Sequence, residues 1–239
     1  MRVAALFLLT ITLTMPGRAS AQDWIEFASR EDQFTCNFPG QPTVTTGEWK
    51  SEYGATLPTR IYSATQGASK YTVTVVDYSL SETILTEKAK SCPAGAETCI
   101  GLADTGIGYW KNDVRGAITY ATWGLMQKAE KSTHLMWNFM EMVQGNQLQL
   151  TNKDGSRTFA SIYMHENKLL IMEGTVPAGY PEPGLFQQSL GWLDKNGTGI
   201  RYSWLYVNDP DVPKPPIRRR TAPNQDQGRI DAPAAAANR

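Results

Sequence analysis

The sequence predicts an α+β protein whose core is an antiparallel β-sheet of about six to nine strands, flanked by two or three helices. Short runs in which apolar and polar residues alternate recur along most of the chain, separated by two-residue turn signals such as Asp154-Gly155. Two other stretches, near residues 80–90 and 112–128, have the period of a helix. Strands joined by two-residue turns run antiparallel, so we expect one continuous antiparallel sheet whose apolar side the helices cover.

The strands before the first helix are expected over residues 24–27, 34–38, 44–53, 57–65 and 71–78. The third and fourth of these form a hairpin that turns at Gly54. The fifth is β-branched or aromatic at nearly every position. That composition is typical of the interior of a sheet, so the fifth strand is predicted to be central.

Two helices follow these strands. Ser79 and Glu82 have the spacing of a capping box, which predicts a helix over about residues 80–90. A second helix is predicted from an apolar stripe with helical intervals, made by Val114, Ala117, Ile118, Ala121 and Leu125. Asn112 or Asp113 is expected to cap its N-terminus.

The rest of the domain is expected to be a four-strand meander followed by a short helix and a last strand. The meander strands are predicted over residues 135–143, 148–150, 159–164 and 169–172. Their turns are predicted at Gly145-Asn146, Asp154-Gly155 and Glu166-Asn167. The short helix is expected to carry Leu185, Phe186, Leu190 and Leu193, and the last strand to span residues 200–206.

The chain divides into three parts by composition. Residues 1–21 combine Arg2, an apolar run and the triplet Ala19-Ser20-Ala21, a pattern that predicts an export signal cleaved near Ala21. A retained N-terminal anchor is the alternative. Residues 22–207 are expected to form a single domain of a periplasmic or secreted protein. Residues 208–239 are rich in Pro, Ala, Gln and Arg, and are predicted to be a disordered tail.

Charge and composition limit the partners. The chain has 23 basic and 23 acidic side chains, with 15 Lys+Arg against 19 Asp+Glu over residues 22–207. Such a mildly acidic domain lacks the concentrated positive face that nucleic acid requires, so nucleic acid is not expected as a partner. The basic run Arg218-Arg219-Arg220 is interpreted as part of the solvated tail, and contact with anionic lipid or peptidoglycan is the alternative.

The three cysteines are expected to differ in role. Cys92 and Cys99 bracket a short loop of small and turn-forming residues, and in an oxidising compartment they are predicted to form a disulfide. Two free thiols or a redox pair are the alternatives, although this spacing is not that of a C-x-x-C redox motif. Cys36 lies between Phe34 and Phe38 on the apolar face of a strand, where it is expected to be a buried, inert thiol.

The segment Phe34–Pro42 reads F-T-C-N-F-P-G-Q-P and resembles the opening F-x-V-x-F-P-x-x-P of the PsbP-like superfamily. The resemblance continues through residues 71–78, the helix around Ala117, residues 161–170 and residues 185–190, and so covers about residues 24–206. It implies an α/β/α sandwich and a protein-binding or assembly role without catalysis. No functional residues are carried over, because no catalytic motif defines the superfamily. Cys36 stands where the pattern usually has an aliphatic residue.

Catalytic chemistry is poorly represented in the sequence. His134 and His165 are the two histidines, and neither belongs to a zinc-binding pattern. His165 is predicted at the tip of a hairpin and is interpreted as a solvated turn residue. His134 opens a strand and is given a similarly structural role. No nucleophile elbow, S-x-x-K pair or Walker-type loop occurs, so no catalytic residue, cofactor or metal site is predicted.

A carboxylate pair is the remaining route to catalysis. Asp77 and Glu173 each end a predicted strand and would have to lie within several ångströms of each other to cleave a glycoside. Ending a strand or capping the next segment is the favoured interpretation of both residues. Asp209 and Asp211 lie in the predicted tail, in a segment too short for a calcium loop.

Three functions are compatible with these features. The first is a non-enzymatic interaction or assembly module of the cell envelope with an unknown protein partner. The second is a carrier of a small apolar ligand or lipid, with Trp49, Trp110 and Trp123 around a pocket between helix and sheet. The third is a hydrolase of unfamiliar design. A filled helix–sheet interface with exposed aromatic side chains would favour the first, and an apolar cavity the second.

Overall fold

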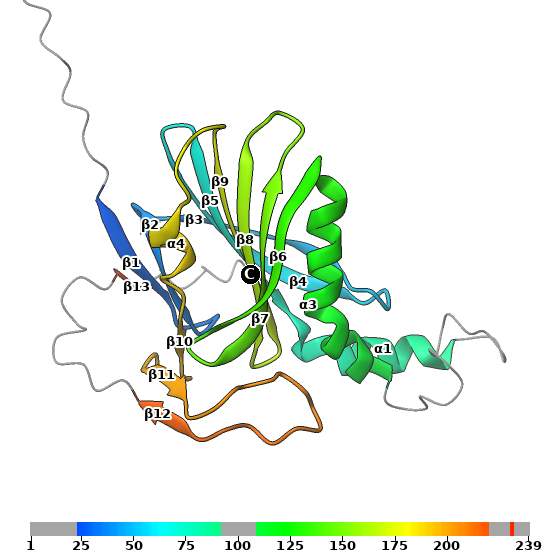
Figure 1. Ribbon diagram of the computed structural model, residues 1–239. Helices are drawn as coiled ribbons and strands as arrows, with labels where there is room; N and C mark the ends of the chain where they lie inside the picture. The colour runs from blue at the N-terminus through cyan, green and yellow to red at the C-terminus, as the bar shows by residue number, and fades with distance from the viewer. Residues whose placement is uncertain (1–22, 92–108, 220–229, 232–239) are drawn as a thin grey trace, which may run out of the picture.

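The computed structural model describes residues 23–91, 109–219 and 230–231 (Figure 1). The predicted export signal and the pair Cys92 and Cys99 lie outside the described residues. Most of the chain is built into a large antiparallel sheet with the strand order β3-β4-β5-β9-β8-β7-β6. Its strands are β3 (Thr43–Lys50), β4 (Thr56–Gln66), β5 (Ser69–Asp77), β6 (Lys131–Met140), β7 (Val143–Thr151), β8 (Arg157–His165) and β9 (Lys168–Val176). As predicted, β5 is an interior strand.

A second, smaller sheet is made mainly from the two ends of the domain. Its order is β12-β11-β10-β2-β1-β13. Its strands are β1 (Trp24–Ser29), β2 (Phe34–Pro39), β10 (Gly191–Leu193), β11 (Gly199–Tyr202), β12 (Ile217–Arg219) and β13 (Ile230–Asp231). The pairs are antiparallel except β1–β13, which is parallel.

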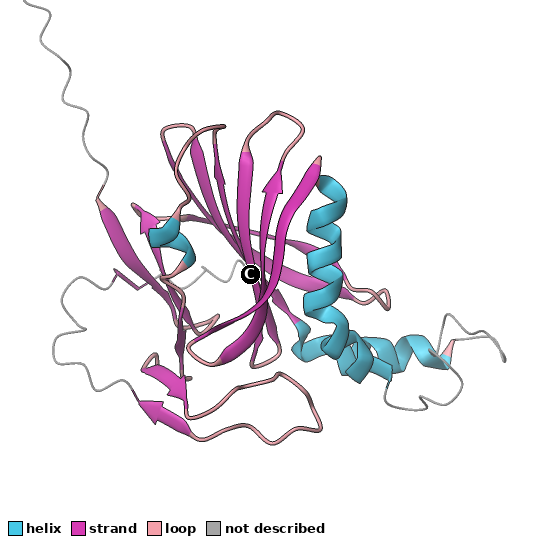
Figure 2. Cartoon of the chain, in the orientation of Figure 1, coloured by secondary structure: helices cyan, strands magenta, loops and turns pink. Residues whose placement is uncertain are grey.

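The two longer helices lie on one face of the large sheet (Figure 2). A turn of 3₁₀ helix, η1 (Tyr78–Leu80), leads into α1 (Ser81–Lys90), and α3 (Tyr109–Lys128) packs over β7, β8 and β9. The predicted apolar stripe of α3 is confirmed, because Val114, Ala117 and Ala121 are buried against the sheet. The two alanines let the helix approach closely, so that the interface is a continuous buried core.

The smaller sheet covers the opposite face of the large sheet. Phenylalanines of β1 and β2 pack on β4, with ring-centroid distances from Tyr62 of 5.4 Å to Phe27 and 5.1 Å to Phe34. A one-turn helix, α4 (Gly184–Gln187), inserts Phe186 between Phe38 and Tyr71. The α+β class is confirmed, but the single continuous sheet is wrong, and so is the α/β/α sandwich, because a second sheet covers this face. Strands β5, β8 and β9 bury consecutive residues on both faces, so a second layer is needed to exclude water from the face without helices.

The hairpin between β6 and β7 turns elsewhere than predicted. The turn residues are Glu141 and Met142, which have φ of 50° and 70° although neither is glycine. Gly145 lies inside β7, where a Cβ atom would stand 2.2 Å from the carbonyl oxygen of Ile162. Gly145 is therefore needed because β7 and β8 approach each other closely at this position, and not because a turn is made there. The predicted turns at Gly54, Asp154-Gly155 and Glu166-Asn167 are confirmed.

The predicted helix caps are wrong at both helices. Asp77 caps η1 by accepting a hydrogen bond from the Ser79 backbone N–H (2.9 Å), and the residue before α1 makes no side-chain cap. Asn112 and Asp113 lie within α3 rather than before it. Asp113 is buried, and its carboxylate accepts from the Tyr53 backbone N–H and the Ser81 hydroxyl. It ties α3 to α1 and to the β3–β4 turn.

The C-terminal boundary at residue 207 lies too early. Strand β12 pairs with β11, Pro215 is buried, and Asn208 exchanges two hydrogen bonds with Asn167. Asp209 forms a bidentate ion pair with Arg115 of α3 (2.9 Å for both contacts). Residues 208–219 were predicted to be disordered because they contain few large apolar side chains. Ion pairs and backbone pairing attach them to the domain instead.

Truncation after Val207 is expected to destabilise the domain, because it removes β12, β13 and the contacts of Asn208 and Asp209. We expect a loss of about 2 kcal/mol of unfolding free energy, or roughly 5 °C in melting temperature for a domain of this size. Thermal unfolding followed by circular dichroism measures this. Truncation after Asp231 keeps every described strand and is the control, and equal melting temperatures for the two truncated chains would contradict the packing of residues 208–219.

Candidate functional site

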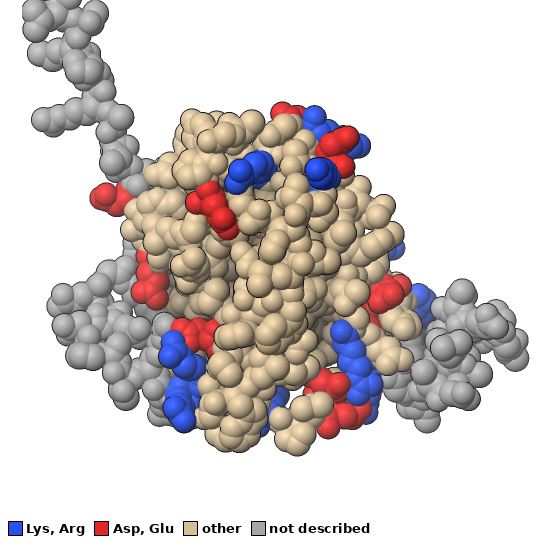
Figure 3. All heavy atoms as spheres, viewed as in Figure 1, with Lys and Arg blue, Asp and Glu red and all other residues tan. Residues whose placement is uncertain are grey.

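Strand β6, at one edge of the large sheet, has an unusually apolar surface. Its relative exposures are 50% for Leu135, 44% for Met136, 51% for Trp137 and 48% for Phe139. Leu135, Trp137 and Phe139 alternate along the strand and therefore share a face, and the rings of the two aromatic residues lie 5.5 Å apart. Figure 3 shows that the surface around β6 has few charged side chains. The charged side chains visible in this view lie mainly toward the periphery of the molecule. We call Leu135, Trp137 and Phe139 the apolar strip.

The backbone of β6 is also available for pairing. Among the described residues, β6 pairs with β7 and with no strand on its other side. Met140 and Val143 flank the two-residue turn and therefore form a hydrogen-bonded pair. Hydrogen-bonded and non-hydrogen-bonded residues alternate along an antiparallel ladder, so the N–H and C=O groups of every second residue of β6 point away from β7. The outward residues are those of the apolar strip. The N–H of Phe139 donates to the side chain of its neighbour Asn138 (2.8 Å).

The apolar strip lies beside α3 rather than beneath it. Leu135 is opposite Leu148, which belongs to the core under the helices, so the strip is on the helix side of the sheet. Asn146, which is opposite Trp137, donates to Thr122 of α3 (3.1 Å). Helix α3 packs over β7, β8 and β9, so this hydrogen bond to β7 lies at the side of the helix nearest β6. The apolar strip on β6 lies beyond that side.

The other edge of the large sheet has a different character. Every residue of β3 except Trp49 is exposed, and the strand contains three threonines, a glycine and the charged pair Glu48 and Lys50. Such residues protect an edge from pairing with other chains. By contrast, β6 carries a charged side chain only at its start, Lys131, and no proline. The two edge strands of the large sheet thus differ in their exposed side chains, which are mainly polar or charged on β3 and mainly apolar on β6.

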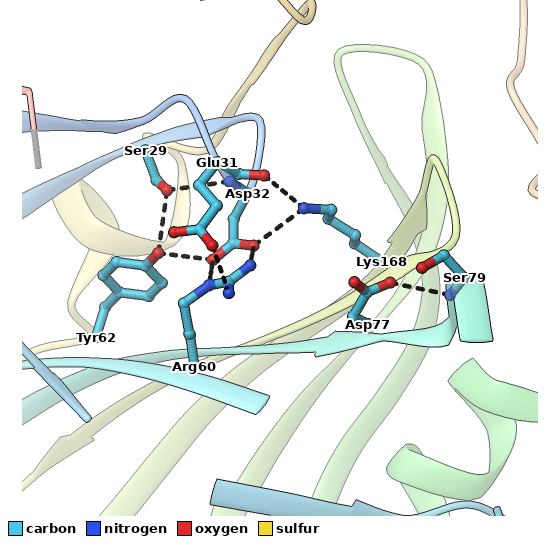
Figure 4. Close-up of polar contacts among 8 residues, drawn as sticks. All are labelled: Ser29, Glu31, Asp32, Arg60, Tyr62, Asp77, Ser79 and Lys168. Atoms are coloured by element: carbon cyan, nitrogen blue, oxygen red, sulfur yellow. Dashed lines mark hydrogen bonds and ion pairs between the residues drawn. The ribbon is translucent and has the colours of Figure 1, made fainter. Parts of the chain in front are cut away.

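A polar cluster joins the two sheets (Figure 4). The carboxylate of Asp32, in the β1–β2 turn, has no exposed surface and lies against Arg60 and Tyr62 of β4. Its Oδ2 accepts from Arg60 Nε (2.7 Å) and Tyr62 Oη (2.6 Å), and its Oδ1 accepts from Arg60 Nη2 and from Lys168 Nζ of β9 (3.1 Å). Burial raises the pKa of Asp32, but the hydrogen bonds from Arg60 and Tyr62 and the charge of Lys168 lower the pKa below its ordinary value.

This cluster is structural rather than catalytic. A carboxylate accepts about four hydrogen bonds, and all four positions on Asp32 are engaged by protein donors. No lone pair is left to take a proton from a substrate. The role of Asp32 is not predictable from the sequence, because its partners lie 28 or more residues away and no local pattern marks them.

His165 is not the solvated turn residue that we predicted. It is buried among the rings of Trp192, Tyr202 and Tyr206, with centroid distances of 4.6, 5.7 and 5.2 Å, and its Nε2 is 2.8 Å from the hydroxyl of Tyr202. Burial, assisted by the charges of Lys214 and Lys168, lowers its pKa to about 3. The imidazole is therefore neutral at pH 7, and it is shielded from any substrate by segments 192–206.

The other residues singled out from the sequence do not form a site. His134 is exposed on β6, beside an irregularity in its pairing with β7. Asp77 is opposite Lys168 and Glu173 is opposite Thr72, five pairs apart on the same ladder. That separation, roughly 17 Å, is too long for a pair of glycosidase carboxylates.

The remaining candidates have structural partners. Asp209 and Asp211 bind Arg115 and Lys111 of α3 instead of a metal ion. In the part of the chain that the structure describes, no three potential ligands gather as a metal site. Cys36 is buried as predicted, 3.3 Å from the hydroxyl of Ser189, and burial raises the pKa of its thiol to about 12.

The three tryptophans proposed to line a pocket do not share one environment. Trp49 and Trp110 pack against the buried core beneath the helices, and the indole N–H of Trp49 donates to the Tyr78 hydroxyl (3.2 Å). Trp123 is 57% exposed on α3. Val114, Ala117 and Ala121 of α3 are buried against the sheet in the interface between helix and sheet.

Comparison with known proteins identifies no relative: no family model, no curated protein and no solved structure matches this chain. None of the described helices has both the length and the apolar character needed to cross a membrane.

Replacement of His165 by Gln is expected to flatten the acid dependence of stability. The folded state holds His165 neutral, with a pKa of about 3 against 6.5 in the unfolded chain. Its contribution is therefore complete above pH 6.5 and is lost as the pH falls toward 3. Between pH 7 and pH 5 the loss is about 2 kcal/mol. Urea unfolding at pH 7 and pH 5 measures this loss, with replacement of the exposed His134 by Gln as the control. If the His165→Gln variant loses as much unfolding free energy between these pH values as the wild type, the loss does not come from His165.

Replacement of Asp32 by Asn is expected to cost about 3–5 kcal/mol of unfolding free energy, because Arg60 and Lys168 would then face each other without the carboxylate between them. Glu31→Gln removes the neighbouring, half-exposed partner of Arg60 and should change stability by less than about 1 kcal/mol. Denaturant unfolding compares the two variants. Similar losses would mean that the buried position of Asp32 has no special importance.

Proposed function

We propose that this chain is an exported, non-enzymatic interaction or assembly module that binds a protein partner along strand β6. The observation that supports this function is the apolar strip on an edge strand that has no described strand on its outer side. Surfaces of this kind bind extended segments by strand addition, in which main-chain hydrogen bonds provide affinity and side-chain contacts provide specificity.

The composition of β6 fits such an interface. Trp, Phe and Met are enriched in the buried centres of protein interfaces, and charged side chains are depleted there. Trp137 lies in the middle of the strip with an apolar neighbour on each side, which is the usual position of a residue that dominates binding energy. In the proposed complex, the partner's backbone pairs with β6 while its side chains cover Trp137 and Phe139.

Export and the absence of catalysis are parts of the same proposal. The signal-like residues 1–21 support a periplasmic or secreted location, where Cys92 and Cys99 would be oxidised. The resemblance of residues 34–42 to the opening of the PsbP-like superfamily supports a binding or assembly role. The engaged carboxylate of Asp32 and the buried neutral His165 support a role without acid–base chemistry.

Replacement of Trp137 by Lys is expected to abolish partner capture from an envelope extract. The change removes the central apolar contact and places a charge in the interface, while the exposed position leaves folding intact. Residues 22–239 are immobilised, and captured proteins are quantified by mass spectrometry against the wild type.

The matched control is Val44→Lys, which changes an exposed apolar residue (43%) on the opposite edge strand β3. This variant should retain the captured protein. Equal capture by the Trp137 variant would overturn the proposed surface. A small molecule found by native mass spectrometry in the wild type, with no captured protein, would favour the carrier function instead.

A further inference from the structure

We infer that the occupant of β6 is a second copy of this chain, which adds its own β6 antiparallel across a two-fold axis. The inference rests on the proposed function, because it names the partner of the same surface. It joins two large sheets into one sheet that continues through both copies, and it removes the apolar edge from water in both chains at once.

The order of residues on the apolar strip is self-complementary. With the two-fold axis at Trp137, this residue faces Trp137 of the second copy, and Leu135 faces the second copy's Phe139. These are the residues whose backbone groups point outward from the β6–β7 ladder, so the ladder between copies and the side-chain contacts are made by the same residues. Aromatic and aliphatic pairs directly opposite each other stabilise a sheet.

The charges of β6 permit this arrangement. Its charged side chain, Lys131, is at the first position of the strand. Antiparallel pairing centred on Trp137 puts the two Lys131 side chains at opposite ends of the joint, roughly 40 Å apart. No like charges oppose each other along the joint, and the centre is apolar.

The opposite edge favours a closed pair over a filament. If β6 of one copy paired with β3 of another, the pair would still have one free β6 edge and one free β3 edge. Further copies could add at both edges, so a filament would grow. Such pairing would set the apolar strip against the threonines and the charged Glu48 and Lys50 of β3. Pairing of β6 with itself buries apolar groups on both sides and ends with two chains.

The area involved predicts a weak dimer. Four large side chains of β6 are about half exposed, and complete coverage of them would remove at most on the order of 400 Å² of surface from each copy. With the backbone included, the total is at most about 1,000 Å², which is the lower bound for a specific interface. A dissociation constant in the micromolar range is therefore expected.

Sedimentation equilibrium of residues 22–239 tests the inference. From about 1 µM to about 500 µM, the mass should rise from one chain toward two. Trp137→Lys should raise the dissociation constant at least about 30-fold, and Val44→Lys should leave it unchanged. A mass of one chain at every concentration overturns the inference, as does a dimer that Trp137→Lys leaves intact.

A cysteine at the axis provides a second test, because a disulfide traps even a weakly associated, short-lived pair of copies. Residues at position 137 of the two copies should have Cα atoms about 5.5 Å apart, within the range that a disulfide spans. Trp137→Cys should therefore form a bridge between two copies under mild oxidation, identified by mass spectrometry as a 137–137 peptide. Val44→Cys is the control; equal bridging by this variant, or none at position 137, overturns the inference.

Failure of the dimer is distinguishable from failure of the proposed function. In one outcome the chain is monomeric, while Trp137→Lys still abolishes its capture of another envelope protein. In that case the proposed dimer is wrong, and the proposed binding of a partner along β6 is supported. If capture of a partner is insensitive to Trp137→Lys and no dimer forms, both are wrong.

Discussion

The buried carboxylate of Asp32 holds the two sheets in one relative position, and the rest of the architecture depends on that position. It extends from the β1–β2 turn and binds residues of β4 and β9 on the large sheet. Since a buried charge is costly without its partners, any sliding of one sheet over the other would break several bonds at once. With helices on one face and the smaller sheet on the other, the large sheet has no further described strand beyond its edge strands β3 and β6.

The local signals in the sequence predicted most of the strands but not their layering. Turns at Gly54, Asp154-Gly155 and Glu166-Asn167 were correct because hairpin geometry is decided by a few neighbouring residues. The second sheet was missed because β2 pairs with β10, and alternation along a strand does not identify a partner more than 150 residues away. A stronger signal was present in β8 and β9, whose runs of consecutive apolar residues require cover on both faces.

The candidate site was predictable only in part, for a similar reason. The sequence places Leu135, Trp137 and Phe139 on one face of a strand, but it does not reveal that this strand is an edge. His165 shows the opposite error: a polar residue beside a two-residue turn is usually exposed, and here Trp192, Tyr202 and Tyr206 cover it from distant segments. In both cases the exposure of a side chain was decided by tertiary neighbours.

The end of β6 near its turn is held rigidly, and this rigidity matters for binding. The Met140 carbonyl accepts from the indole N–H of Trp192 (2.8 Å), and the Met142 carbonyl accepts from the N–H of Tyr206 (2.7 Å). Glu141, between them, is paired with Arg201. These contacts explain how a turn without glycine keeps its positive φ angles. They also order the end of the apolar strip next to the turn, which would lower the cost of ordering this surface in the complex proposed above.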